Sequence, residues 1–172
     1  VVLQSILDDK PIFQNMTHNQ LANFSLLHDA FSSDLRMVEV VRHPVELIDS
    51  WMRRSWGTRL SEDPRALVIC FRFGGKDLPF FASGWEETYL TASPIGRVIR
   101  MIASLWDRNM ESFALLSESQ QRQVFILPFT GFVQEPNTYL GRLADFLGSK
   151  TTNHTKSALK RQRCRRKYDI NH

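Results

Sequence analysis

The stretch of residues 37–51 constrains the fold most, because it changes from one hydrophobic pattern to another within a few residues. Residues 37–41 form a short run rich in β-branched residues, which is typical of a buried strand. From Val45 to Trp51, apolar residues recur at helical spacing. Pro44 suits the first turn of that helix, since its missing N–H has no partner to lose there. A strand followed at once by a helix predicts an α/β fold with a parallel sheet.

The other apolar patterns extend this expectation along the chain. Residues 19–33 and 93–116 have the three- and four-residue spacings of amphipathic helices. Residues 124–129 read as a second buried strand, and residues 139–147, closed by Gly148, as a further helix. The segments therefore predict helices and parallel strands in alternation.

One segment breaks the alternation of strands and helices. Residues 66–73 and 78–82 are apolar runs on either side of Gly74-Gly75-Lys76-Asp77, which predicts a β-hairpin. We interpret residues 55–92 as an insertion on the carboxyl-end rim of the sheet, where the substrate-contacting loops of open α/β folds lie.

The composition indicates a single globular domain, residues 1–172. The 172 residues are 42% hydrophobic and 23% charged, enough to bury one sizeable core. The formal net charge is +4, and much of the positive charge lies in residues 153–172. Charge alone does not choose between nucleic acid, anionic lipid, a phosphorylated small molecule and plain solvation. Aromatic and basic residues do not interleave there as a strand-binding groove requires, so no nucleic-acid partner is expected.

Metal sites, membrane spans and targeting signals have little support in the sequence. The two cysteines, Cys70 and Cys164, have no metal-ligand spacing, so no metal is expected. No run approaches the roughly 18 apolar residues of a membrane-spanning helix. The chain does not begin with Met, and we expect residues before Val1 in the natural protein. Sequons at Asn15, Asn23 and Asn153 leave cytoplasm and Golgi lumen both open as the compartment.

Arg42 and Ser50 are the residues with the clearest chemical meaning. Arg42 ends the predicted strand, where its planar, permanently charged fork could face a phosphate. Ser50 lies two helical turns later and could point its hydroxyl at the same group. The alternative is an ordinary surface arginine and a helix serine bonded to its own backbone.

This strand-Arg-x-Pro-x5-Ser stretch resembles the 3′-phosphate-binding signature of the sulfotransferase family. The resemblance continues through Leu26-Leu27-His28-Asp29-Ala30-Phe31 before the strand and through residues 125–148, which end in Phe-Leu-Gly. It implies a three-layer α/β sandwich with a central parallel sheet, of the P-loop nucleoside triphosphate hydrolase-like type. It also implies in-line transfer of a sulfuryl group from 3′-phosphoadenosine 5′-phosphosulfate to a hydroxyl or amine of an unidentified acceptor. Arg42, Ser50, Arg165 and Lys167 are the nucleotide-binding residues that it implies.

Two departures from the family pattern limit what this chain could do alone. The Gly-rich, basic phosphosulfate loop of the family occurs nowhere in the sequence, and only 41 residues precede Arg42. We therefore expect an N-terminally truncated sulfotransferase-like domain that is inactive by itself. At Thr130 and Gly131 many relatives carry a Glu-Asp pair, so local loop contacts there are expected to differ.

The candidate catalytic base is His18. Thr17-His18 resembles the Thr-His pair of the cytosolic branch, although Met16 replaces the Lys that precedes that pair. Neutral imidazole can accept the proton of an acceptor hydroxyl at neutral pH. Other branches use a Glu from the amino-terminal region, and His18 could also be a surface residue. His43 follows Arg42 directly and is expected to face away from the phosphate, in a structural role.

Two further alternatives stay open. The chain could be a non-catalytic adenine-nucleotide-binding or scaffold protein that kept the sheet and lost the chemistry. Trp85-Glu86-Glu87 could offer an aromatic platform with carboxylates for a polar acceptor, or simply connect the hairpin to a helix through a half-buried Trp.

Overall fold

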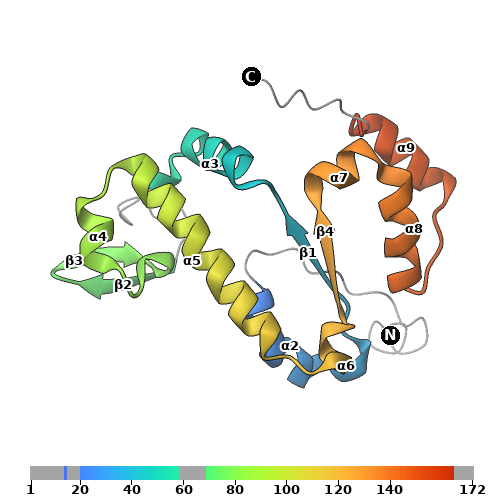
Figure 1. The fold of residues 1–172 in the computed structure, drawn as a ribbon, viewed down its shortest axis with the longest axis horizontal. Coiled ribbons are helices and arrows are strands. Elements are labelled where there is room, and N and C mark those ends of the chain that lie inside the picture. The colour runs from blue at the N-terminus through green and yellow to red at the C-terminus, as the bar shows by residue number, and fades with distance from the viewer. Residues whose placement is uncertain (1–13, 15–19, 59–68, 165–172) are drawn as a thin grey trace, which may run out of the picture.

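The computed structural model describes residue 14, residues 20–58 and residues 69–164. These residues form an α/β structure with a small parallel sheet, a separate hairpin and surrounding helices (Figure 1). The strands are β1 (Met37–Val41), β2 (Cys70–Phe73), β3 (Lys76–Pro79) and β4 (Val124–Pro128). The α-helices are α2 (Phe24–Phe31), α3 (Pro44–Arg53), α4 (Glu86–Thr91), α5 (Pro94–Ala114), α6 (Glu118–Gln121), α7 (Phe129–Gln134), α8 (Pro136–Phe146) and α9 (Asn153–Arg161). The 3-10 turns are η1 (Leu21–Asn23), η2 (Ser32–Asp34), η3 (Trp56–Thr58) and η5 (Phe80–Ala82).

The parallel sheet consists of β1 and β4, paired in register from Met37 opposite Val124 to Val41 opposite Pro128. Side chains alternate between the two faces of a strand, so Met37 and Val124 share one face and Phe125 points to the other. Met37 and Val124 belong to an apolar cluster that also contains residues of α5, whereas the Phe125 ring contacts Phe146 of α8. Helices α5 and α8 thus lie on opposite sides of the sheet (Figure 1).

The predicted strand-to-helix transition at residue 44 is confirmed. Helix α3 begins with Pro44 in its first turn, and His43 is its N-cap residue. The long helix predicted from residue 93 is also present as α5, where the Ser93 hydroxyl accepts a hydrogen bond from the Gly96 N–H at 3.3 Å. That bond satisfies one of the N–H groups that a helix start leaves open.

The predicted hairpin is confirmed for residues 70–79, whereas the prediction of a strand over residues 80–82 is wrong, and residues 66–68 lie outside the described residues. Strands β2 and β3 are antiparallel, and the turn between them places Gly74 and Gly75 at φ of 55° and 76°. Glycine adopts such left-handed conformations without the steric cost that a Cβ brings. The second strand ends at Pro79, because Phe80–Ala82 turns into a 3-10 helix. Figure 1 shows the hairpin on the side of α5 opposite to β1 and β4.

The largest core joins the hairpin to α4 and α5. Its buried members are Leu78, Phe81, Ala82, Trp85, Tyr89, Val98, Met101 and Leu105. Burial of each large apolar side chain in such a cluster stabilises the fold by about 1.5–3 kcal/mol. A smaller cluster of Leu21, Phe24, Met37 and Leu116 lies where the sheet begins.

Arg97 ties the elements around the larger core together. Its Nε donates to the Tyr89 carbonyl at 2.6 Å, its Nη1 to Gly57 at 3.2 Å and its Nη2 to Leu90 at 3.1 Å. The guanidinium also lies 4.9 Å from the centre of the Tyr89 ring. One side chain on α5 therefore holds the end of α4 and the turn η3.

The segment after β4 differs from the expected loop. Residues 129–134 form the helix α7, and α8 follows at once from Pro136. Gly131 permits this arrangement, because a Cβ at that position would overlap the hydroxyl and ring of Tyr139 on α8. The Glu-Asp pair that the family resemblance suggested for positions 130 and 131 could not be accommodated here without moving Tyr139.

Candidate functional site

Arg42 lies at the carboxyl edge of the sheet, next to the beginning of α7. It follows Val41, which is paired with Pro128, so Arg42 and Phe129 leave neighbouring strands at the same edge. The Arg42 guanidinium lies 4.7 Å from the centre of the Phe129 ring. Its Nη2 is 3.5 Å from Oε2 of Glu46, one turn into α3. The charged group is therefore held between an aromatic face and a carboxylate.

Several polar atoms at this edge are buried and lack a hydrogen-bond partner within the described ranges. They are Nε of Arg42, Oε2 of Glu46 and Oγ1 of Thr130, the residue after Phe129. The side chains of Arg42 and Glu46 are 32% and 24% exposed, so part of each remains open to solvent. Buried polar atoms in proteins normally have partners, and exceptions often mark functional positions. An oxyanion could accept from the guanidinium and from the Thr130 hydroxyl.

Ser50 lies one turn beyond Glu46 on α3. Residues four apart on a helix share a face, so the sequence Arg42, Glu46, Ser50 follows one side of this strand-to-helix unit. Ser50 is half-buried. The structure brings Arg42 against Glu46 and Phe129, and it places Ser50 farther along the same helical face.

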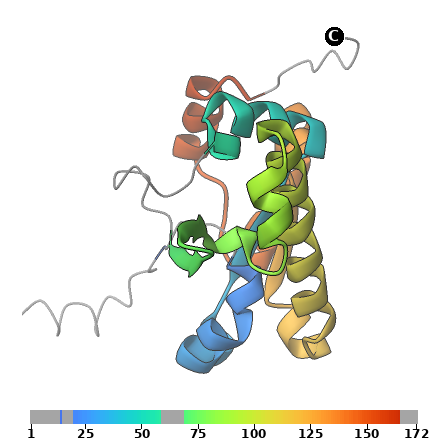
Figure 2. The same ribbon diagram turned by 90° about the vertical axis from the view of Figure 1, so that its left-hand side faces the viewer.

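The other sequence-predicted site residues have different outcomes. His43 is exposed and makes no side-chain capping bond to α3. His18, Arg165 and Lys167 lie outside the described residues. The helix α9, which precedes Arg165, lies at the same end of the molecule as α3 and α7 (Figures 1 and 2).

Trp85 does not form a platform for an acceptor. It is 7% exposed, belongs to the larger core, and donates from its indole N–H to the Phe81 carbonyl at 2.8 Å. The structural alternative for Trp85 is therefore confirmed. Its neighbour Glu86 accepts from the Gly84 N–H at 2.8 Å, and this bond lowers the pKa of the Glu86 carboxyl.

A second polar pair lies on the face of the sheet that α5 covers. Asn109 of α5 is 8% exposed, and its Nδ2 donates to Oε1 of Glu39, in the middle of β1, at 3.4 Å. The Oδ1 atom of Asn109 is buried and has no partner among the described residues. Burial raises the pKa of the Glu39 carboxyl. The folded protein therefore favours the neutral, protonated form of the Glu39 carboxyl group.

Sequence reasoning missed three residues of the Arg42 site: Glu46, Phe129 and Thr130. The position of Glu46, four residues after Arg42, was a usable signal, because helical neighbours at that spacing pair. Phe129 and Thr130 had no comparable signal, since their position depends on the pairing of β1 with β4.

The described residues contain neither a membrane-spanning helix nor a cluster of metal ligands. None of their helices is both long enough and apolar enough to cross a membrane. Within the same ranges, His, Cys, Asp and Glu side chains form no group of three or more that could hold a metal ion. Comparisons of the chain with protein-family models, with curated proteins and with solved structures gave no match.

Proposed function

We propose that this chain is a sulfotransferase-type domain that binds the 3′-phosphate of 3′-phosphoadenosine 5′-phosphosulfate. The observation that carries the proposal is the position of Arg42, at the carboxyl end of β1, with a buried Nε that lacks a described partner. Pro44 in the first turn of α3 and Ser50 two turns along complete the pattern that resembles the family. The full fold would be a three-layer sandwich with a larger parallel sheet of the P-loop type.

The reaction proposed for this fold breaks the bond between sulfur and the bridging phosphate oxygen. The acceptor oxygen or nitrogen forms the new bond to sulfur, a base takes the acceptor proton, and adenosine 3′,5′-bisphosphate leaves. The protein positions the donor and stabilises the developing charge on the leaving phosphate. Arg42 and Ser50 would hold the nucleotide, Arg165 and Lys167 would add positive charge at the 3′-phosphate, and His18 would be the base.

A second candidate function is nucleotide binding without sulfuryl transfer. The observation that favours it is the sequence itself, in which no Gly-rich phosphosulfate loop occurs within the 172 residues. Such a loop supplies the backbone N–H groups and the basic residue that hold the 5′-phosphosulfate. The two candidates agree on the Arg42 site and differ in whether labelled sulfate reaches an acceptor.

Binding measurements with two nucleotides test the Arg42 site. Adenosine 3′,5′-bisphosphate should bind more tightly than adenosine 5′-monophosphate, which lacks the 3′-phosphate. Arg42→Ala should remove that preference, weakening bisphosphate binding by about 1.5–3 kcal/mol, the usual worth of a charge-assisted hydrogen bond. Arg72→Ala is the matched control, because Arg72 is also ion-paired, to Asp77 at 2.7 Å, and lies in the hairpin. Equal weakening by both variants, or no preference for the bisphosphate, would overturn the site.

A further inference from the structure

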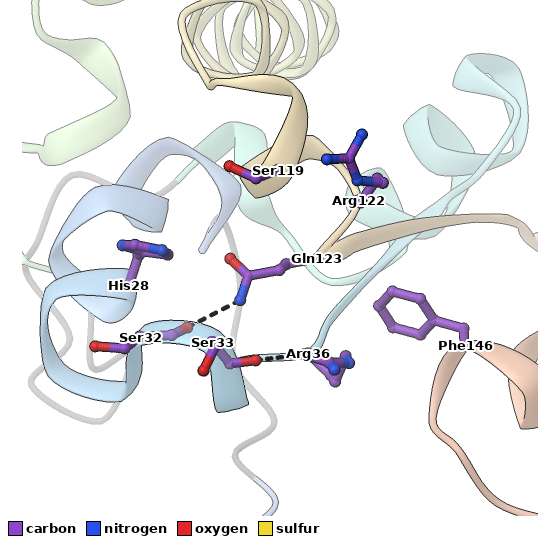
Figure 3. A pocket seen from close by; sticks show the side chains of 8 residues that line it. All are labelled: His28, Ser32, Ser33, Arg36, Ser119, Arg122, Gln123 and Phe146. Carbon is purple, nitrogen blue, oxygen red and sulfur yellow. Dashed lines mark hydrogen bonds between the residues drawn. The ribbon is translucent and has the colours of Figure 1, made fainter.

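A pocket of about 630 Å³ lies where the two parallel strands begin, at the edge of the sheet opposite to Arg42. Arg36 directly precedes β1, and Arg122 and Gln123 directly precede β4. Because the strands are parallel and in register, these residues meet at the same edge. Figure 3 shows Arg122 and Ser119 above Gln123, and Ser32 and Ser33 below it. The volume is in the range of small-molecule sites.

The arginine at the bottom of the pocket is fixed in place by the backbone. Nη1 of Arg36 donates to the carbonyl oxygens of Ser33 at 2.7 Å and Leu35 at 2.8 Å. A guanidinium has five N–H donors, so those on Nε and Nη2 remain for a ligand. A guanidinium that is already oriented loses less entropy when it binds an oxyanion.

The guanidinium of the second arginine, Arg122, is only weakly held by the protein. Nη1 of Arg122 is 3.7 Å from Oε2 of Glu118, and the two side chains are 72% and 92% exposed. Exposed ion pairs of this kind contribute about 0–1 kcal/mol, so an anionic ligand can displace the carboxylate. Two permanently charged groups therefore line the pocket on either side of Gln123 (Figure 3).

Gln123 lines the pocket with an amide that is held in place. Its Nε2 donates to the Ser32 carbonyl at 2.9 Å, which fixes the amide, while its Oε1 is buried and has no partner among the described residues. Ser32 has a φ of 48°, an uncommon value for a residue with a Cβ. Strained backbone of this kind persists where surrounding contacts require it.

The geometry points to a binding site for a small organic phosphate or sulfate ester. Arg36 and Arg122 would bind the tetrahedral oxyanion, and Ser119 lies beside them. The ring of Phe146, which packs on Phe125 at 5.4 Å, would contact the apolar body of the ligand. Gln123, whose amide is held by its bond to the Ser32 carbonyl, lies between the two arginines. The site is separate from the Arg42 site and does not depend on the proposed function.

Phenyl phosphate is the probe for the oxyanion and its apolar body. Phenyl phosphate is titrated into the isotope-labelled full chain, and the amide chemical shifts are measured by NMR. The shifts of residues 32–36 and 119–123 should change and reach saturation. Inorganic phosphate should bind more weakly, because it has no ring to contact Phe146. Phenyl sulfate in place of phenyl phosphate distinguishes a sulfate ester from a phosphate ester. Saturating adenosine 3′,5′-bisphosphate should leave phenyl phosphate binding unchanged, which separates this site from that of Arg42.

Arg122→Ala should weaken phenyl phosphate binding about tenfold, the effect of losing one charge-assisted hydrogen bond. Arg53→Ala is the matched control, since Arg53 is 75% exposed and paired with Asp49 four residues earlier on its own helix. Ser119→Asp adds a negative charge at the pocket and should also weaken phenyl phosphate binding, so it is a second, independent variant. Absence of saturable binding, shifts confined to other residues, or equal effects of Arg53→Ala and Arg122→Ala would overturn the proposal.

Discussion

The guanidinium of Arg42 and the carboxylate of Glu46 lie 3.5 Å apart, across the first turn of α3. Glu46 occupies a position from which a bound oxyanion would be repelled, and it is 24% exposed. An anion that binds Arg42 must therefore replace this carboxylate or share the guanidinium with it. If the proposed phosphate binds at Arg42, Glu46 consequently limits how tightly it is held.

Glu46→Gln is expected to tighten the binding of adenosine 3′,5′-bisphosphate. The amide removes a like charge from the phosphate site and can still hydrogen-bond the guanidinium, so we expect an improvement of about three- to tenfold, or roughly 1 kcal/mol. Calorimetric or fluorescence titration measures it. Glu87→Gln, an exposed change on α4, is the control for the overall loss of a negative charge. Weaker binding after Glu46→Gln would show that Glu46 mainly orients Arg42.

Glu39→Gln is expected to stabilise the fold at neutral pH. Burial raises the pKa of the Glu39 carboxyl above its ordinary value of 4.5, so the folded state holds the proton more strongly than the unfolded chain. The stability from that protonated form is fully present below about pH 4.5 and is lost as pH rises through the higher, folded-state pKa. A glutamine is neutral at every pH and can donate to the buried Oδ1 of Asn109, a hydrogen bond worth about 1 kcal/mol.

Urea denaturation of both proteins between pH 4 and pH 7 measures this effect. The difference in unfolding free energy between Glu39→Gln and the parent should grow as pH rises through the Glu39 titration. Taking the difference removes the opposite contribution of Asp49, whose pKa is lowered first by its hydrogen bond from Arg53. A pH-independent difference would show that Glu39 is not the group responsible.

Local sequence patterns predicted most of the elements and little of the site. The strand β1, the first turn of α3 at Pro44 and the glycine turn after β2 follow from short-range periodicity and backbone preference, so each could be predicted without tertiary information. Helix α7 could not, because Phe129–Gln134 is a helix of only six residues whose packing depends on Gly131 and Tyr139.

The residues around Arg42 were likewise predictable only where they depend on local sequence. Arg42 was predictable because a strand end fixes where its side chain begins, and Glu46 follows from helical spacing. The contact of Arg42 with Phe129 joins residues 87 positions apart and arises only from the pairing of β1 with β4. The pocket of Arg36 and Arg122 depends on the same pairing, which hydrophobic periodicity does not specify.

Arg97→Lys is expected to destabilise the fold by about 2–4 kcal/mol. Lysine keeps the charge but replaces a planar fork by a single ammonium, which cannot reach the Tyr89, Leu90 and Gly57 carbonyls together. Urea denaturation followed by tryptophan fluorescence reports this loss, because Trp85 is buried in the larger core and Trp56 packs against that core. Arg161→Lys, an exposed change in the last turn of α9, should alter stability by less than about 0.5 kcal/mol. Similar losses in the two variants would contradict the role given to Arg97.

Replacing two glycines by alanine, one on α7 and one on α8, should change the stability of the fold in opposite directions. A Cβ at Gly131 would overlap the hydroxyl and ring of Tyr139, so Gly131→Ala requires Tyr139 or α8 to move and should cost about 1–3 kcal/mol. A Cβ at Gly141, within α8, would meet nothing within 4 Å, so Gly141→Ala should stabilise the helix by about 0.5–1 kcal/mol.

Urea denaturation and nucleotide titration of both glycine variants distinguish packing from helix propensity. Adding Tyr139→Phe to Gly131→Ala removes the hydroxyl nearest to the new methyl group, and it should recover part of the lost stability. Because α7 carries Phe129 and Thr130, displacement of this helix should also weaken binding of adenosine 3′,5′-bisphosphate, whereas Gly141→Ala should leave binding unchanged. A stable Gly131→Ala variant with unchanged nucleotide binding would show that the Tyr139 side chain can move aside without displacing α7.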